Sequence, residues 1–289
     1  MNLWQSHGAR AAGAALAVTV LAACGSGSGS TGTTGSATGS AAPAASSPGS
    51  VPAGVLLKDG EITFCSDLTS PPLEFLDATQ KPVGAEIELG AALAKSMGLT
   101  AKWANTAFNG IIPALQAKQC DAILSQLYIK PEREKAVDFV PYLNSSNTVM
   151  VKTGSQISGM DALCGKKVAA QTGTTAADYF KQASSKCSGG ALDIRLFTKD
   201  SDALQQLKLG LVDAYGTTLE TAAYVMKQQP GQFGMAGDPF GVIACGIATR
   251  KDARAVHDAV ATALRAIRTD GSYDKILANW NLTGDALKS

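Results

Sequence analysis

The chain has 289 residues, of which 45% are hydrophobic and 17% charged, so it can bury one large core or two modest ones. Its 25 basic and 24 acidic residues nearly balance, and Arg10 is the only charged residue among the first 23. This neutral, mixed composition argues against a nucleic-acid-binding protein and against a polybasic membrane patch.

Residues 1–23 predict an export signal. Arg10 precedes an apolar run of about 13 residues, which is too short to cross a bilayer. Leu21-Ala22-Ala23 before Cys24 resembles a bacterial lipoprotein signal, which implies lipidation of Cys24 and attachment to the outer face of the cell membrane by the lipid anchor only. The alternative is ordinary secretory cleavage near Ala22-Ala23, with Cys24 an incidental thiol.

Residues 24–53 are expected to form a disordered tether. From Gly25 to about Pro52 the chain consists almost wholly of Gly, Ser, Thr, Ala and Pro, without charged or aromatic residues. Such a segment cannot bury enough apolar surface to repay its ordering.

Strands and helices then alternate. We expect strands at 61–67, 100–106 and 121–125, with helices at 85–98 and 109–118 between them. The alternation resumes with strands at 165–171, 192–197 and 212–216 and helices at 174–185 and 201–209. This order predicts an α/β fold of mostly parallel sheets flanked by helices.

Two extended segments, near 142–150 and 240–247, are predicted to cross between two lobes. After the second crossing come two helices, at about 252–269 and 272–280. Lobe one is therefore expected to contain residues 54–143 and 247–289, and lobe two residues 144–246.

The cysteines and histidines limit the chemistry. His7 lies in the signal and His257 on a polar helix face, so the mature chain lacks a Ser-His-Asp or Cys-His arrangement and any zinc spacing. We expect no cofactor and no metal. In an oxidising compartment Cys164 and Cys187 are predicted to form a disulfide, whereas Cys65, Cys120 and Cys245 are interpreted as small buried residues at or near strands.

The two halves of the chain share a pattern. Asp121-Ala122 corresponds to Asp213-Ala214, and Ser125-Gln126 corresponds to Thr217-Thr218. Because ligands of open α/β sheets sit beyond the carboxyl ends of the strands, these polar strand ends predict the two walls of one cleft.

From about Glu61 to Leu282 the chain resembles the solute-binding proteins of bacterial ABC importers for polar amino acids and opines. The resemblance rests on SDLTSPPLEF, GAEIELGAALAKSMG, FNGIIPALQAKQCDAI, KPEREKAVDFVPY, GKKVAAQTGTT and DGSYDKILANW, which occur in the family's order. It implies a two-lobed, type II periplasmic-binding-protein-like fold with two hinge strands, closing on one small solute, and an ABC permease as partner. We expect a monomer that is not an enzyme.

The resemblance assigns roles to residues. Arg133 falls where the family holds a ligand carboxylate, and the alternative is a surface charge paired with Glu132 or Glu134. Thr174 and Thr175 are expected to donate to the same carboxylate or, alternatively, to cap a helix. The full predicted ligand site is Asp67, Ser70, Phe108, Ser125, Gln126, Tyr128, Arg133, Gln171, Thr174, Thr175 and Thr218.

Two of these assignments have a structural alternative. Phe108 is expected to stack on the ligand stem but could belong to the core. Asp67 is expected to face a cationic or amide group but could cap a turn.

Three residues depart from the family's pattern. The family usually has an aromatic residue at Ser70, an Asp at Thr218 and a Ser or Thr at Tyr128. That Asp normally pairs with the α-ammonium group of the ligand, whereas Thr218 can only form hydrogen bonds. The carboxylate is therefore the more secure feature of the ligand, and the expected solute is a carboxylate-bearing amino acid, opine or zwitterionic osmolyte.

Two other functions are possible on this fold. One is a cyclohexadienyl-dehydratase-like enzyme, for which Asp67, Glu74 and Glu220 are the acids expected near the cleft. The other is a surface sensor.

Overall fold

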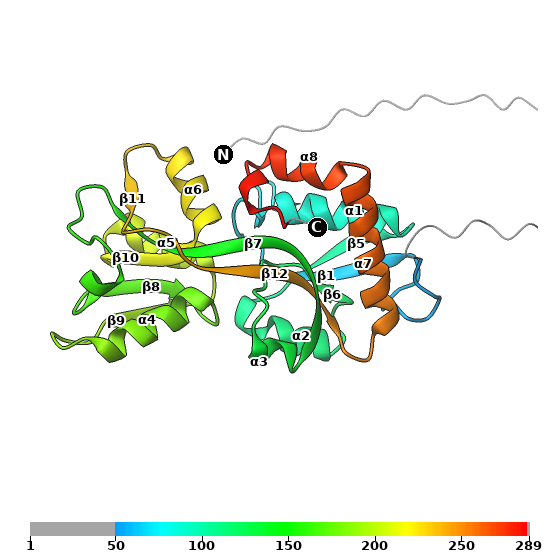
Figure 1. Cartoon of the computed structure of the whole chain (residues 1–289), viewed down its shortest axis with the longest axis horizontal. Coiled ribbons are helices and arrows are strands. Elements are labelled where there is room, and N and C mark those ends of the chain that lie inside the picture. The colour runs from blue at the N-terminus through cyan, green and yellow to red at the C-terminus, as the bar shows by residue number, and fades with distance from the viewer. Residues whose placement is uncertain (1–49, 288–289) are drawn as a thin grey trace, which may run out of the picture. The chain divides into compact units, whose positions relative to one another are not determined.

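The computed structural model describes residues 50–287, which form two lobes joined by two long strands (Figure 1). The strands β7 (Val137–Lys152) and β12 (Phe240–Arg250) pair antiparallel, with Cys245 opposite Leu143. The chain before β7 and after β12 builds lobe one, and the chain between them builds lobe two. The predicted export signal, Cys24 and most of the predicted tether lie outside the described residues.

Lobe one surrounds three parallel strands. β1 (Glu61–Ser66) lies between β5 (Thr100–Asn105) and β6 (Ala122–Ile123). Its helices are α1 (Ala85–Ser96), α2 (Ile111–Gln116), α3 (Pro131–Glu134), α7 (Arg254–Thr269) and α8 (Ser272–Asn279). The apolar residues of α1 and α7 repeat at helical spacing and pack in one core, whereas α2 covers a second core on the other side of the sheet.

Lobe two repeats this plan. β8 (Lys167–Gln171) lies between the parallel strands β10 (Ala214–Thr218) and β9 (Asp193–Phe197), and β10 pairs antiparallel with β7. The remaining elements are α4 (Thr175–Lys186), α5 (Asp200–Leu209), α6 (Leu219–Gln228) and the short strand β11 (Phe233–Met235). Two hydrophobic clusters, one with Phe180 and one with Tyr215, pack in this lobe.

The sequence pattern shared by the two halves has a structural counterpart. In lobe one the Asp121 carboxylate accepts a hydrogen bond from the backbone N–H of Thr63 (2.8 Å), and the Asp121 N–H donates to the Thr63 carbonyl. In lobe two Asp213 makes the same pair of bonds with Lys167 (Oδ2–N 2.8 Å). Each Asp thus fixes the start of a strand that ends at the cleft.

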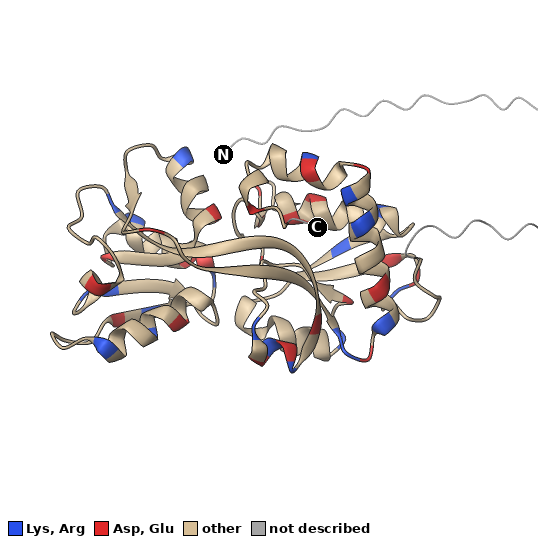
Figure 2. Ribbon diagram, viewed as in Figure 1, with Lys and Arg blue, Asp and Glu red and all other residues tan. Residues whose placement is uncertain are grey.

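Charged side chains are distributed unevenly. Figure 2 shows Lys, Arg, Asp and Glu interspersed over both lobes, while the middle of β7 and of β12 carries none. Among residues 50–287 no helix has both the length and the apolar character of a membrane span.

The expectation for two of the cysteines was wrong. Cys65 on β1 and Cys120 just before β6 form a disulfide, rather than standing unpaired as small buried residues. A disulfide also joins Cys164 and Cys187, and Cys245 on β12 is a buried free thiol. β1 and β6 are neighbouring strands, so the sheet brings the first pair together although 55 positions separate them in sequence.

Some elements were not predicted. A small sheet of β2 (Thr69–Ser70), β3 (Glu74–Leu76) and β4 (Pro82–Val83) follows β1. Helix α6 begins directly after β10, where Thr218 ends the strand and caps the helix.

Candidate ligand cleft

A cavity between the lobes collects most of the predicted site. It is lined by ten of the eleven predicted residues, namely Ser70, Phe108, Ser125, Gln126, Tyr128, Arg133, Gln171, Thr174, Thr175 and Thr218. Asp67 is not in the lining; it is buried behind Gln171, whose Nε2 donates to the Asp67 carboxylate. The lining also includes Glu74, Asn147, Asp200 and Thr217, which were not predicted as ligand contacts.

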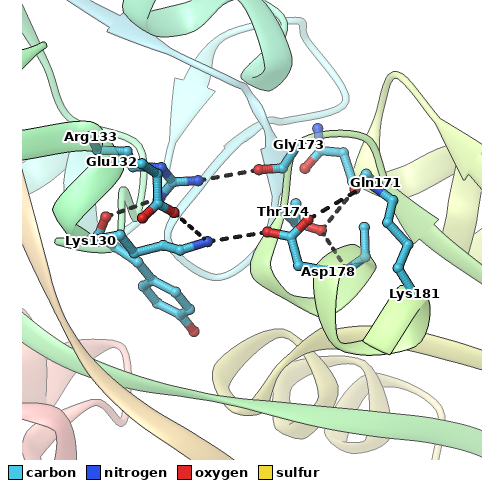
Figure 3. A network of polar contacts seen from close by, with 10 residues as sticks. Lys130, Glu132, Arg133, Gln171, Gly173, Thr174, Asp178 and Lys181 are labelled. Carbon is cyan, nitrogen blue, oxygen red and sulfur yellow. Dashed lines mark hydrogen bonds and ion pairs between the residues drawn. The ribbon is translucent and has the colours of Figure 1, made fainter. Parts of the chain in front are cut away.

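Arg133 projects from the short helix α3 toward lobe two (Figure 3). Its Nη1 donates to the Tyr128 carbonyl (3.0 Å) and its Nη2 to the Gly173 carbonyl (3.2 Å). Its guanidinium lies 5.5 Å from the centre of the Phe108 ring. Burial lowers the pKa of Arg133, yet a guanidinium stays charged at any physiological pH.

The alternative role of Arg133, a surface charge paired with Glu132 or Glu134, does not fit the described structure, in which Arg133 forms no ion pair with either residue. Glu132 pairs instead with Lys130 (3.0 Å), whose Nζ also reaches Asp178 on lobe two (3.1 Å). No carboxylate of residues 50–287 is bonded to Arg133, which therefore presents its positive charge to the cleft.

The threonines at the start of α4 have different roles. The Thr174 hydroxyl donates to the Gln171 carbonyl (2.7 Å) and accepts from the Ala177 N–H (3.3 Å), so it caps the helix. The Thr175 hydroxyl is buried, lines the cavity and has no hydrogen-bond partner in the described part of the chain. Thr175 is thus the free hydroxyl of this wall.

Gly173 brings the backbone of lobe two close to lobe one. Its φ of 83° is in the left-handed region, and a Cβ there would lie 3.2 Å from the Asn109 Cα. Only glycine suits both the conformation and the close approach.

Ser125 links the backbone of Asp67 to the buried carboxyl group of Glu74. Its Oγ accepts from the Asp67 N–H (2.9 Å) and donates to Glu74 Oε1 (3.0 Å). Burial, reinforced by the charge of Glu86, raises the pKa of Glu74 well above its usual range. Burial in the cavity wall therefore favours the protonated form of the Glu74 carboxyl group.

Gln126 bridges the lobes. Its φ of 41° is unusual for a side-chain-bearing residue, and its N–H donates to Glu86 Oε1 (2.9 Å) beneath the cleft. Its Nε2 donates to Glu220 Oε2 on α6 and to Ser145 Oγ on β7, both at 3.0 Å. Burial raises the pKa of Glu220 to about 7.

The hydroxyl groups of Tyr128 and Thr218 already form hydrogen bonds within the protein. The Tyr128 hydroxyl lies 2.8 Å from Ser145 Oγ. Thr218 Oγ1 accepts from the Thr221 N–H (3.3 Å) as the cap of α6, so this hydroxyl is engaged within lobe two.

The lobes touch across the cleft at several points. Besides the bonds of Lys130, Arg133 and Gln126, the Asp200 N–H of lobe two donates to Thr69 Oγ1 of lobe one (3.1 Å). The conformation is therefore a closed one. Three buried polar atoms of the cavity lining, Asn147 Nδ2, Thr175 Oγ1 and Glu74 Oε2, have no hydrogen-bond partner among residues 50–287, which suits a small polar solute.

The residues missed by sequence reasoning differ in how they could have been found. Asp200 begins the helix after strand β9, so the rule that polar strand ends face the cleft, applied to one more strand, would have found it. Asn147 lies within β7, where nothing in the sequence marks the side that faces the cleft.

A comparison with protein families matches residues 62–283 to the bacterial extracellular solute-binding proteins, family 3. The chain belongs to this family. Among its relatives is ABC transporter arginine-binding protein 1 of Escherichia coli K12, which is 34% identical over 230 residues, 76% of this chain and 90% of that protein.

Solved structures of similar proteins have the same fold. An ancestral arginine-binding protein bound to glutamine aligns with a TM-score of 0.72 and 34% identity, covering 77% of this chain and 98% of that one. An ancestral amino-acid-binding protein described as a precursor of cyclohexadienyl dehydratase aligns with a TM-score of 0.70 and 33% identity, covering 76% and 95%. This chain thus has the mixed α/β fold of the amino-acid-binding proteins.

Proposed function

We propose that this protein is the substrate-binding component of an ABC importer and captures a small carboxylate-bearing solute, an amino acid or a derivative of one. The bodies that close on the solute are residues 54–143 with 247–289, and residues 144–246. Relatives named as amino-acid-binding proteins of ABC transporters support this function. We propose that it acts by binding rather than by catalysis.

The observation that carries the proposal is the position of Arg133. Its guanidinium lines an enclosed cavity beside the Phe108 ring, and no carboxylate of the described residues is bonded to it. A planar guanidinium binds a carboxylate through two parallel hydrogen bonds. The unpartnered Thr175 hydroxyl on the opposite wall supplies a further donor.

A ligand screen tests the proposal. Thermal unfolding of the full chain is followed with amino acids, opines and betaines, and each stabilising compound is then titrated by calorimetry. A solute that binds only the native state raises the unfolding temperature, because it stabilises that state by RT ln(1 + L/Kd), where L is the concentration of free solute. We expect at least one carboxylate-bearing compound to stabilise the protein; stabilisation only by compounds without a carboxylate would refute the role of Arg133.

We further propose that the protein is held outside the cell membrane by a lipid on Cys24. The support is sequence alone, Leu21-Ala22-Ala23 before Cys24 followed by an uncharged segment, because these residues lie outside the described structure. Cys24→Ala is expected to release the protein from the membrane fraction or leave it unprocessed, without altering the folded lobes. Membrane retention of a processed, non-acylated variant would contradict the anchor.

A second candidate is an enzyme of the cyclohexadienyl dehydratase type. It is favoured by the likeness to the precursor protein and by Glu74, a buried acid that lines the cavity. Glu220 lies further back, bonded to Gln126 and Ser145. Incubation with prephenate or arogenate, with detection of an aromatic product, separates this candidate from the importer component.

A further inference from the structure

Glu220 is a buried acid at a point where the two lobes meet. It lies on the first turn of α6 in lobe two and is 4% exposed. Its Oε2 accepts hydrogen bonds from Gln126 Nε2 of lobe one (3.0 Å) and from Ser145 Oγ of the hinge strand β7 (2.9 Å). Its Oε1 is buried and has no hydrogen-bond partner within the part of the chain that the structure describes. Separation of the lobes would remove the Gln126 contact, so the surroundings of this carboxyl group depend on closure.

A second cavity lies on the other side of Glu220, between α6 of lobe two and the chain that follows α8 in lobe one. Tyr224 of α6 and Trp280 of lobe one line it together with Glu220. The Phe75 ring of lobe one bridges these two walls, with its centre 6.0 Å from that of Tyr224 and 6.1 Å from that of Trp280. Because the walls belong to different lobes, separation of the lobes widens this cavity and lets water reach the Glu220 carboxyl group.

No cation neutralises Glu220 in the closed conformation. Among residues 50–287, no Lys or Arg forms an ion pair with it. Burial, reinforced by the charge of Asp285, raises the pKa of Glu220 to about 7. The titratable groups that face Glu220 or share the second cavity with it are Glu86 of α1, Tyr128 after β6, Cys245 of β12, Tyr224 and the exposed Lys227 of α6, and Asp285 of the short helix η3 (Thr283–Asp285).

Resting on the proposed function, we infer that cleft closure is coupled to protonation of Glu220, so that the protein closes on its solute more readily at acidic pH and releases it as the pH rises. In the open conformation water solvates the carboxylate. In the closed conformation the ionised form loses that water without gaining a cation, which disfavours it. The closed conformation therefore binds more protons than the open one, and a fall in pH shifts the population toward closure.

Two other buried acids are distinguished from Glu220 by their contacts. The Glu86 carboxyl group accepts hydrogen bonds from the Gln126 N–H and the Tyr142 hydroxyl, both of lobe one. The Asp200 carboxyl group accepts from the Tyr215 hydroxyl of its own lobe, and it is the Asp200 N–H that contacts lobe one. Glu220 is thus the acid whose carboxyl group itself bonds to a side chain of the opposite lobe.

Single-molecule energy transfer measures closure without a solute. Lys135 and Gln182 are exposed residues on α3 and α4, the helices joined by the ion pair of Lys130 with Asp178. Both are replaced in the full chain by p-acetylphenylalanine, whose ketone takes donor and acceptor dyes without reaction at any cysteine. The ratio of closed to open molecules is expected to be at least about fivefold higher at about pH 5.5 than at about pH 8.

Glu220→Gln tests the source of this change, because the amide has the shape of the acid but does not titrate. The variant is expected to reduce the change to less than about twofold. Glu88→Gln is the control, since Glu88 is an exposed glutamate of α1, and it should retain the full change. Asp200→Asn should also retain most of it.

Three results would overturn the inference: an equal ratio at the two pH values in wild-type protein, a change that Glu220→Gln retains in full, or a change that Asp200→Asn abolishes. If Glu220→Gln does not fold, the wild-type ratio and the Asp200→Asn ratio decide.

Calorimetry with L-glutamine, which a similar solved protein binds, extends the test to solute capture. The α-carboxylate, the α-ammonium group and the uncharged side chain of glutamine change little in charge over this pH range. Its Kd is expected to be at least about fivefold lower at about pH 5.5 than at about pH 8.

Failure of the proposed function is distinguishable from failure of this inference. If no solute of the ligand screen binds, the proposed function fails, and the energy-transfer ratio still decides whether closure is coupled to Glu220. If glutamine binds with a Kd that does not depend on pH, the proposed function stands and the coupling is wrong.

Discussion

Arg133 of lobe one donates a hydrogen bond from Nη2 to the backbone carbonyl of Gly173 in lobe two, at 3.2 Å. The same guanidinium donates from Nη1 to Tyr128 of its own lobe. Since a guanidinium has five N–H donors, others remain for a solute. Arg133 thus takes part both in the proposed capture of the carboxylate and in contact between the lobes.

Substitution of Arg133 is expected to have the largest effect on binding. Arg133→Ala should weaken solute binding by about 2 to 5 kcal/mol, because it leaves a buried carboxylate unpaired. This corresponds to roughly 30-fold to several-thousand-fold in Kd, measured by calorimetry. Arg133→Lys should recover little, since an ammonium group cannot form the bidentate contact.

Arg254→Ala is the control for Arg133. Arg254 is an exposed residue of α7 that pairs with Asp258 (3.0 Å). Its loss should change the free energy of unfolding by no more than about 0.5 kcal/mol and leave Kd unchanged. Near-wild-type affinity of Arg133→Ala would show that the carboxylate binds elsewhere, and the role of Thr175 would fall with it.

The ion pair between Lys130 and Asp178 is expected to hold the lobes closed (Figure 3). The Lys130 side chain is 19% exposed and that of Asp178 41%, so the pair should contribute at most about 1 kcal/mol. Lys130→Met should therefore raise Kd by up to about fivefold, chiefly through faster release, and the effect should shrink at high salt.

A matched control lies on α4, the helix that carries Asp178. Lys181 also pairs with Asp178, at 3.7 Å, but both residues belong to lobe two. Lys181→Met should leave the release rate unchanged in stopped-flow measurements. Equal effects of the two lysine variants would show that the loss of a surface charge, rather than contact between lobes, alters release.

The stability of the ligand-free protein should fall as the pH rises toward neutrality. Burial raises the pKa of Asp200 and of Glu220 to about 7, from 3.8 and 4.5 respectively. At pH values between the ordinary pKa of each group and its raised native pKa, the native state binds more protons than the unfolded state. The stabilisation from these groups is therefore complete below about pH 4 and is lost as the pH passes through about 7.

Urea unfolding at about pH 5.5 and about pH 8 measures this dependence. Asp200→Asn and Glu220→Gln should each reduce the difference by on the order of 1 kcal/mol. Asp202→Asn should not, because Asp202 is exposed. A pH dependence that both buried-site variants retain in full would rule out these two residues as its source.

Both disulfides are expected to stabilise the fold. Replacing Cys164 and Cys187 by Ala should cost about 3 kcal/mol and replacing Cys65 and Cys120 about 4 kcal/mol, since the second pair closes the longer loop. Non-reducing peptide mapping should find these two pairs, with Cys245 as the alkylatable thiol after unfolding. Detection of Cys65 or Cys120 as a free thiol in the native protein would contradict the first pair.

Local sequence patterns determined most of the elements and most of the strand ends that face the cleft. The apolar spacing in α1 and the alternation of strands and helices depend on residues close together in sequence, so both can be predicted without knowledge of the fold. Arg133 and Thr175 were predicted as ligand residues by motif resemblance, and both line the cavity.

Only the tertiary structure decided which distant residues share an environment. Cys65 meets Cys120 because β1 pairs with β6, and Asp200 meets Asp67 because the closed lobes bring α5 beside Thr69. Burial is likewise a tertiary property: the sequence marks Glu74, Asp200 and Glu220 as acids but not as acids withdrawn from water. Their raised pKa values depend on that withdrawal, which only the tertiary structure shows; sequence alone predicted a carboxylate-binding cleft and left its preferred solute open.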